Sequence, residues 1–147
     1  MTPTTPATRS LVLEREFPHS PEKVWRALTE GPLLEQWLMS NDFLPQVGHR
    51  FTFRSNPNPN WNGVSDCEVL EVVPPLRLSY RVEASGEEAT TGMRTVVTWA
   101  LSPTEKGVRL RLEQSGFLDK DEANYVGAGF GWPRFLGKLE RLLGDLR

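Results

Sequence analysis

The last third of the chain combines a strand pattern with a long amphipathic segment, and this combination constrains the fold more than any other feature. Apolar and polar residues alternate from Val108 to Gln114, which is typical of a strand with one buried face. From Trp132 to Leu143 apolar residues recur at helical spacing, so this segment is predicted to be a helix with one wide apolar stripe. Such a helix buries its stripe by lying across a sheet. The space between the two surfaces holds either a packed core or a pocket, and the function depends on which.

The rest of the chain predicts one continuous α+β domain. Further strand patterns run from Leu11 to Phe17 and from Gly63 to Val73, the second with a change of parity that indicates a bulge. Ser20 and Pro21 favour a helix start, and a second short helix follows the break at Gly31. The connections are too short for crossovers, so six to seven strands are expected to pair antiparallel. We expect a curved antiparallel sheet wrapped around a long C-terminal helix, with a short helical hairpin after the first strand.

Length, charge and cysteine content limit the possible functions. The 147 residues correspond to one ordinary domain, and we expect it to span residues 10–147 after a disordered segment at 1–9. The net charge of -2 comes from interspersed charges, which argues against nucleic acid as a partner. The lone Cys67 excludes an internal disulfide and a cysteine-based zinc site, and we expect no metal and no cofactor. Without an apolar run of about 20 residues, no membrane span is expected, and a reducing cytoplasm is the predicted location.

Several short motifs, in this order along the chain, resemble the activator-of-heat-shock-protein-90-ATPase-like family of the START and birch-pollen-allergen superfamily, also called SRPBCC. The resemblance extends from about Ser10 to Leu143, and the ordered set of motifs carries it rather than any one of them. The motifs are Leu13–Phe17, Pro21–Thr29, Gln36-Trp37, Gly48 before Phe51–Phe53, Glu71–Leu78, Gln114–Phe117 and Gly131–Leu139. The resemblance implies a helix-grip fold with a deep apolar cavity between the sheet and the last helix. Its members carry lipids, bind aromatic or polyketide molecules, act as cyclases or assist a chaperone, so it does not decide the function.

Inward-facing aromatic residues and one inward amide make up the candidate binding site. Many relatives carry a histidine where this chain has Gln114, and an amide does not exchange protons at neutral pH. Gln114 is therefore either a polar anchor for a ligand or a partner for a backbone group at the strand end. The glycines at 127, 129 and 131 are expected to loosen the start of the last helix. The candidate ligand-binding residues are Trp37, Phe51, Phe53, Trp61, Tyr80, Val97, Trp99, Leu112, Gln114, Trp132, Phe135 and Leu136.

Three functions fit these features. The first is binding of a small hydrophobic or aromatic molecule, lipid-like or polyketide-like, with Trp99, Phe53 and Trp132 as walls and no catalytic residue. The second is a cyclase or dehydratase, whose acid and base could come only from Tyr80, Asp42, Glu113 and His49. The third is a module that contacts a chaperone and regulates its ATPase in a stress response. We expect a monomer or weak dimer in each case.

Overall fold

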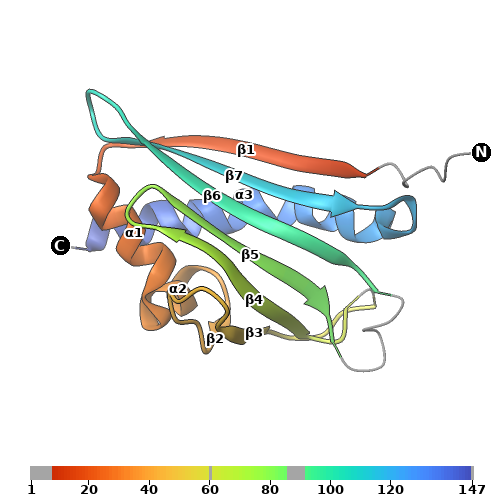
Figure 1. The fold of residues 1–147 in the computed structure, drawn as a ribbon. Helices are drawn as coiled ribbons and strands as arrows, with labels where there is room; N and C mark the ends of the chain where they lie inside the picture. The colour runs from red at the N-terminus through yellow and green to blue at the C-terminus, as the bar shows by residue number, and fades with distance from the viewer. Residues whose placement is uncertain (1–7, 60, 86–91, 147) are drawn as a thin grey trace, which may run out of the picture.

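A seven-stranded antiparallel sheet with a long helix across one face forms the molecule (Figure 1). The computed structural model describes residues 8–59, 61–85 and 92–146. The strands are β1 (Arg9–Phe17), β2 (Ser40–Asn41), β3 (Arg50–Arg54), β4 (Val64–Val73), β5 (Arg77–Ala84), β6 (Arg94–Pro103) and β7 (Val108–Phe117). The helices are α1 (Pro21–Thr29), α2 (Gly31–Trp37), the 3₁₀ helix η2 (Asp119–Asp121) and α3 (Glu122–Asp145). The predicted α+β helix-grip fold is confirmed.

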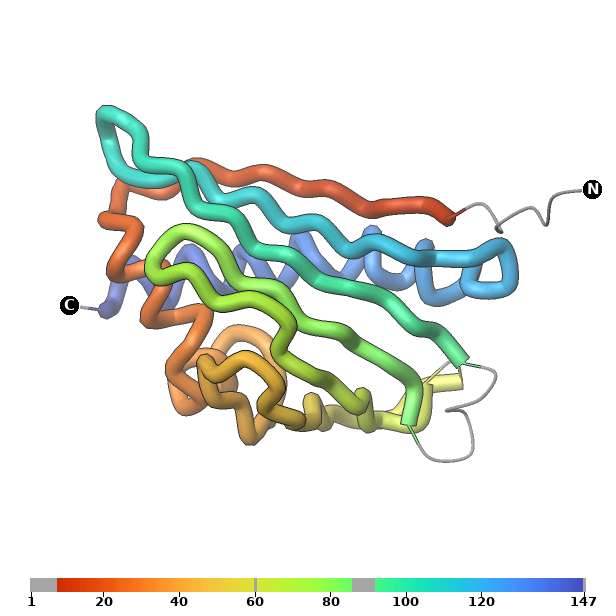
Figure 2. The backbone as a smooth tube through the Cα atoms, in the orientation of Figure 1, coloured from red at the N-terminus to blue at the C-terminus, as the bar shows by residue number. Residues whose placement is uncertain are grey.

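The strand order places the first strand beside the last. The order is β1-β7-β6-β5-β4-β3-β2, so six strands form a meander and β1 pairs with β7 at the far edge (Figure 2). In that pair Leu13 lies opposite Leu112. The predicted domain start at residue 10 falls inside β1, which begins at Arg9, and most of the segment predicted to be disordered lies outside the described residues.

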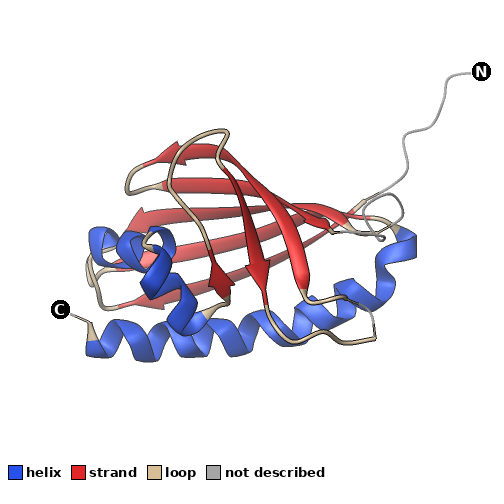
Figure 3. Ribbon diagram, turned by 90° about the horizontal axis from the view of Figure 1, so that it is seen from below, coloured by secondary structure: helices blue, strands red, loops and turns tan. Residues whose placement is uncertain are grey.

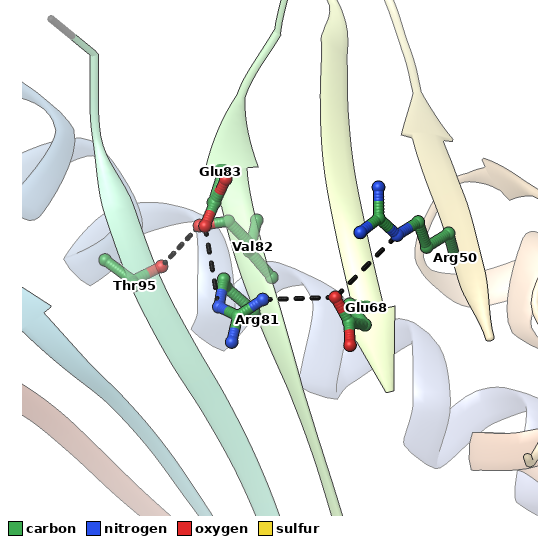
Figure 4. Close-up of polar contacts among 6 residues, drawn as sticks. All are labelled: Arg50, Glu68, Arg81, Val82, Glu83 and Thr95. Atoms are coloured by element: carbon green, nitrogen blue, oxygen red, sulfur yellow. Dashed lines mark hydrogen bonds and ion pairs between the residues drawn. The ribbon is translucent and has the colours of Figure 1, made fainter. Parts of the chain in front are cut away.

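The outer face of the sheet carries charges that pair across neighbouring strands. Glu68 lies opposite Arg50 on one side and Arg81 on the other, with N–O distances of 3.9 and 3.2 Å, and Arg81 also contacts Glu83 at 3.5 Å (Figure 4). Exposed ion pairs of this kind contribute about 0–1 kcal/mol each. Because side chains alternate along a strand, this polar outer face leaves the apolar residues on the inner face.

A bulge in β4 keeps its apolar residues on that inner face. The pairing of β4 with β5 shifts between Val69 and Glu71, where the sequence predicted a change of parity. Before the shift Cys67 and Val69 are buried, and after it Val72 packs against the core opposite Leu78. One extra residue therefore converts an irregular apolar pattern into one continuous buried surface.

The predicted helical hairpin is present and covers one end of the sheet. Ser20 begins α1 as expected, because its side-chain oxygen accepts a hydrogen bond from the Lys23 backbone N–H at 3.2 Å. The Trp37 indole of α2 donates to the Ala27 carbonyl of α1 at 2.9 Å, which fixes the two short helices together. The hairpin lies near the end of the sheet where the chain's C-terminus is found (Figure 3).

The two halves of α3 differ in the size of their buried side chains. From Trp132 onward α3 buries large side chains, among them Leu136, Leu139 and Leu143, whereas before Trp132 it buries none. The three glycines expected to loosen the helix start lie inside α3, which begins at Glu122 and runs through all of them. Packing of a long helix against a sheet outweighs the low helix propensity of single glycines. Among the described helices, none is long and apolar enough to cross a membrane.

Candidate ligand-binding cavity

A cavity of about 420 Å³ lies between the sheet and the N-terminal half of α3. Pockets for small molecules in proteins usually measure about 300–1,000 Å³. Apolar and aromatic side chains make up most of the wall, with a few neutral polar groups. The lining residues are Leu38, Met39, Phe53, Asn58, Pro59, Trp61, Ser65, Tyr80, Val82, Met93, Val97, Gln114, Ala123, Asn124, Gly127, Ala128, Trp132 and Phe135.

Small residues on α3 explain why the space is not filled. Ala123, Gly127 and Ala128 line the cavity where bulkier residues would close it. A Cβ atom built at Gly127 meets no neighbouring atom within 4 Å. Two turns further along the helix Leu136 is 2 % exposed and the space is packed, so the change in side-chain size along α3 sets the inner limit of the cavity.

Edge-to-face rings separate the cavity from the rest of the core. Trp132 contacts Phe135 and Trp99 with ring centroids 5.8 and 5.5 Å apart, and Trp99 contacts Trp37 at 5.7 Å. Their interplanar angles of 67° to 84° are those that aromatic quadrupoles favour. Trp132 and Phe135 thus form a wall, and Trp99 and Trp37 support it from behind.

Gln114 belongs to a short chain of buried hydrogen bonds. Its Nε2 donates to Thr95 Oγ1 at 3.0 Å, and its Oε1 accepts from the Trp132 indole N–H at 2.9 Å. Thr95 in turn donates to the Val82 carbonyl at 3.3 Å. Of the two interpretations of Gln114, the structure shows side-chain partners and a place in the cavity wall, not a bond to a backbone group at the strand end.

Tyr80 supplies the second deeply buried polar group of the wall. Its hydroxyl oxygen accepts a hydrogen bond from the Trp99 indole N–H at 3.0 Å. Burial raises the pKa of the Tyr80 hydroxyl well above its ordinary value, and the bond from Trp99 opposes this only in part. Tyr80 is therefore neutral and protonated at physiological pH, which suits it to donate a hydrogen bond but not to act as a base.

Seven of the twelve residues predicted for the site line the cavity. These are Phe53, Trp61, Tyr80, Val97, Gln114, Trp132 and Phe135. The other five lie in the packed core and do not reach the cavity surface. They are Trp37, Phe51, Trp99, Leu112 and Leu136.

Some of the lining residues that sequence reasoning missed carry a usable signal. Ser65 shares the inward parity of Cys67, and Asn124 and Ala128 precede Trp132 by eight and four residues on one face of α3. Asn58 and Pro59 lie in an irregular loop, for which no periodicity could have identified them.

The other three acid–base candidates lie away from the cavity. Asp42 accepts from the Thr52 backbone N–H at 2.7 Å, and the His49 imidazole contacts the Asp42 carbonyl at 2.9 Å. Glu113 pairs with Arg111 at 2.9 Å on the outer face of the sheet. Among the lining residues that the structure describes, no side chain is a carboxylate or an imidazole. The described part of the chain also lacks any group of three or more potential metal ligands.

Comparison with known proteins assigns the chain to a family. The family described as activator of Hsp90 ATPase homolog 1-like protein matches residues 18–144. Protein MLL2253 from Mesorhizobium loti shares 49% identity and a TM-score of 0.85, with 93% of this chain and 98% of that chain covered. No curated protein matches the chain.

More distant solved structures share the fold. Protein BH1534 from Bacillus halodurans has 25% identity and a TM-score of 0.74, with 92% of this chain and 96% of that chain covered. CalU16 from Micromonospora echinospora has 21% identity and the same TM-score, with 92% of this chain and 76% of that chain covered. The match over residues 18–144, together with the fold, shows that the chain belongs to the activator of Hsp90 ATPase homolog 1-like family of SRPBCC-fold proteins.

Proposed function

We propose that the protein binds a small hydrophobic or aromatic molecule in the cavity between the sheet and α3. The observation that carries this proposal is a space of about 420 Å³ walled mainly by aromatic and aliphatic side chains. A soluble protein gains stability by filling such a space with its own side chains. Here small residues on α3 leave it open instead, as a binding protein requires.

The proposed binding residues divide into walls and orienting groups. Four aromatic residues offer ring surfaces to a flat ligand: Phe53, Trp61, Trp132 and Phe135. Val97 on β6 forms the floor of the cavity. Tyr80 and Gln114 orient the ligand by hydrogen bonds. The core residues Trp37, Phe51, Trp99, Leu112 and Leu136 hold these walls in place.

Burial of apolar surface supplies most of the binding energy. A tricyclic ligand that buries about 300 Å² gains about 7 kcal/mol at about 25 cal/mol per Å². Loss of rigid-body freedom offsets part of this gain. We therefore expect dissociation constants of about 10 μM or weaker, because 7 kcal/mol corresponds to about 7 μM before this loss is subtracted.

Titration with Nile red, a neutral environment-sensitive dye, tests the proposal. We expect enhanced dye emission at a stoichiometry of one, together with quenching of tryptophan emission. The quenching should decrease in Trp61→Phe, because Trp61 lines the cavity, and persist in Trp25→Phe, because Trp25 lies in α1 away from it. Dye emission unchanged by native protein would refute the proposal. Native mass spectrometry of the purified protein would identify a ligand retained from the cell.

Contact with a chaperone is the alternative function, because the family description refers to an activator of the Hsp90 ATPase. Such a contact would use the surface and would not require a cavity. The space beneath α3 is the observation that favours ligand binding over this alternative.

A further inference from the structure

The hydrogen-bond partners of Gln114 fix which way its amide faces. Thr95 gives its hydroxyl proton to the Val82 carbonyl (Figure 4), so its oxygen is left to accept from Gln114 Nε2. The Trp132 indole can only donate, so it must face Gln114 Oε1. The amide oxygen is thus engaged by the protein, while Nε2 of this lining residue keeps a second hydrogen to donate.

The same reasoning applies to Tyr80. The Trp99 indole can only donate, so the Tyr80 oxygen is the acceptor in that bond. The hydroxyl proton of Tyr80 is then left to point elsewhere. Across residues 8–59, 61–85 and 92–146, neither this proton nor the second hydrogen of Gln114 Nε2 meets a protein acceptor.

The two donors occupy one row across the sheet. Tyr80 pairs with Val97, and Val97 pairs with Gln114, so the three residues lie side by side on β5, β6 and β7. All three line the cavity. Two strand spacings separate the Cα atoms of Tyr80 and Gln114 by about 10 Å. The floor of the cavity therefore offers an apolar centre between two hydrogen-bond donors.

The cavity wall also lacks charge. In the portion of the lining that the structure describes, no residue is Asp, Glu, Lys, Arg or His. The remaining polar groups, Ser65, Asn58 and Asn124, are neutral as well. A buried carboxylate or ammonium group on a ligand would therefore lose hydration without gaining a counter-ion.

From this arrangement we infer that the cavity selects neutral aromatic ligands that bear a carbonyl group, such as ketones or quinones. This inference rests on the proposed function and adds to it the chemical class of the ligand. A carbonyl oxygen accepts hydrogen bonds and donates none. It therefore matches Tyr80 and Gln114, which can each still donate a hydrogen bond while their oxygens already accept one from a tryptophan. Carboxylates and amines do not fit this wall.

Three ligands with the same ring system test the inference: fluorene, 9-fluorenone and fluorene-9-carboxylate. Their dissociation constants are measured by displacement of Nile red. We expect 9-fluorenone to bind about three- to tenfold more tightly than fluorene, the value of one neutral hydrogen bond. At the concentration at which fluorene displaces half of the dye, the same concentration of fluorene-9-carboxylate should displace none.

Matched variants assign the preference to the two donors. Tyr80→Phe and Gln114→Leu should each reduce the ratio of ketone to hydrocarbon affinity. Trp99→Phe is the control for Tyr80→Phe, because it removes the same indole–hydroxyl bond but keeps the Tyr80 hydroxyl. Because Trp99 supports the Trp132 ring, Trp99→Phe should weaken both ligands alike and keep the ratio, and thermal melts of all variants show that each is folded.

The possible outcomes separate this inference from the proposed function. If fluorene binds but 9-fluorenone binds no more tightly, or the carboxylate binds equally well, the inference is overturned and the proposed function stands. If Nile red binds but none of the three compounds displaces it, the inference is overturned and the proposed function stands. If Nile red itself does not bind, both are overturned. A ketone preference that both donor substitutions reduce and Trp99→Phe preserves supports the inference.

Discussion

Replacing Gly127 by leucine tests both the helix and the cavity in one variant. Gly127 lies inside α3, lines the cavity and has open space around the position of a Cβ atom. A helical side chain lies over the turn that precedes it, so a leucine at 127 would cover Ala123 and Asn124, which also line the cavity. Gly129 provides the matched control. It is exposed, has similar open space and follows Tyr125 and Val126, which do not line the cavity.

The two substitutions should stabilise the protein to a similar extent. Glycine in a helix interior is about 1 kcal/mol less favourable than alanine, and leucine is close to alanine. We therefore expect each variant to be more stable by about 0.8 kcal/mol, a rise in Tm of about 2–4 °C. A Cβ atom at 127 or at 129 meets no atom within 4 Å, so the start of either side chain does not oppose this gain.

Ligand binding should distinguish the two variants. If the leucine at 127 removes about 60 Å² of ligand contact, the affinity falls by about 1.5 kcal/mol, or about tenfold. Gly129→Leu should bind Nile red as the unsubstituted protein does. The assays are thermal unfolding and dye titration of the three proteins. Equal dye affinity in both variants would show that the ligand does not occupy the space beneath the N-terminal half of α3.

Two further predictions concern stability. Leu139 is 0% exposed, so Leu139→Ala should lower the free energy of unfolding by about 2–5 kcal/mol in denaturant titrations, while Leu44→Ala, at a site 53% exposed, should change it by less than about 0.5 kcal/mol. A small effect at Leu139 would mean that α3 is not docked on the sheet. Burial raises the pKa of Tyr80, so its contribution to stability is complete below its unfolded-state pKa of about 10 and is lost as the pH rises through its folded-state pKa. The free energy of unfolding should therefore fall less steeply above pH ~10 in Tyr80→Phe than in the unsubstituted protein, and equal slopes would contradict the assignment.

Alternation along the strands could be recognised without a structure. Tyr80, Trp99 and Gln114 were all placed on the inner face from parity, and all three are buried there. Parity is reliable in this chain because one sheet face is charged and the other apolar. The helix stripe around Leu139 followed from spacing in the same way. These are local properties, set by backbone geometry and the requirement to bury apolar side chains.

A side chain on the inner face of the sheet does not always line the cavity. The side chains of Tyr80 and Trp99 are hydrogen-bonded to each other, yet only Tyr80 lines the cavity. The difference depends on which part of α3 lies opposite each residue. The extent of α3 was itself unclear from sequence, because Gly127, Gly129 and Gly131 indicated a weak start where the structure has a continuous helix.

The sequence by itself therefore determined which faces are apolar, that the strands pair antiparallel and that a helix crosses them. The tertiary structure alone decided where the interior is filled and where it is open, and which polar atoms of Gln114 and Tyr80 the described residues already engage. The physical reason is the sequence distance over which each property is set. Periodicity records contacts between a residue and its own strand or helix, whereas a cavity is the volume left over when elements distant in sequence pack together.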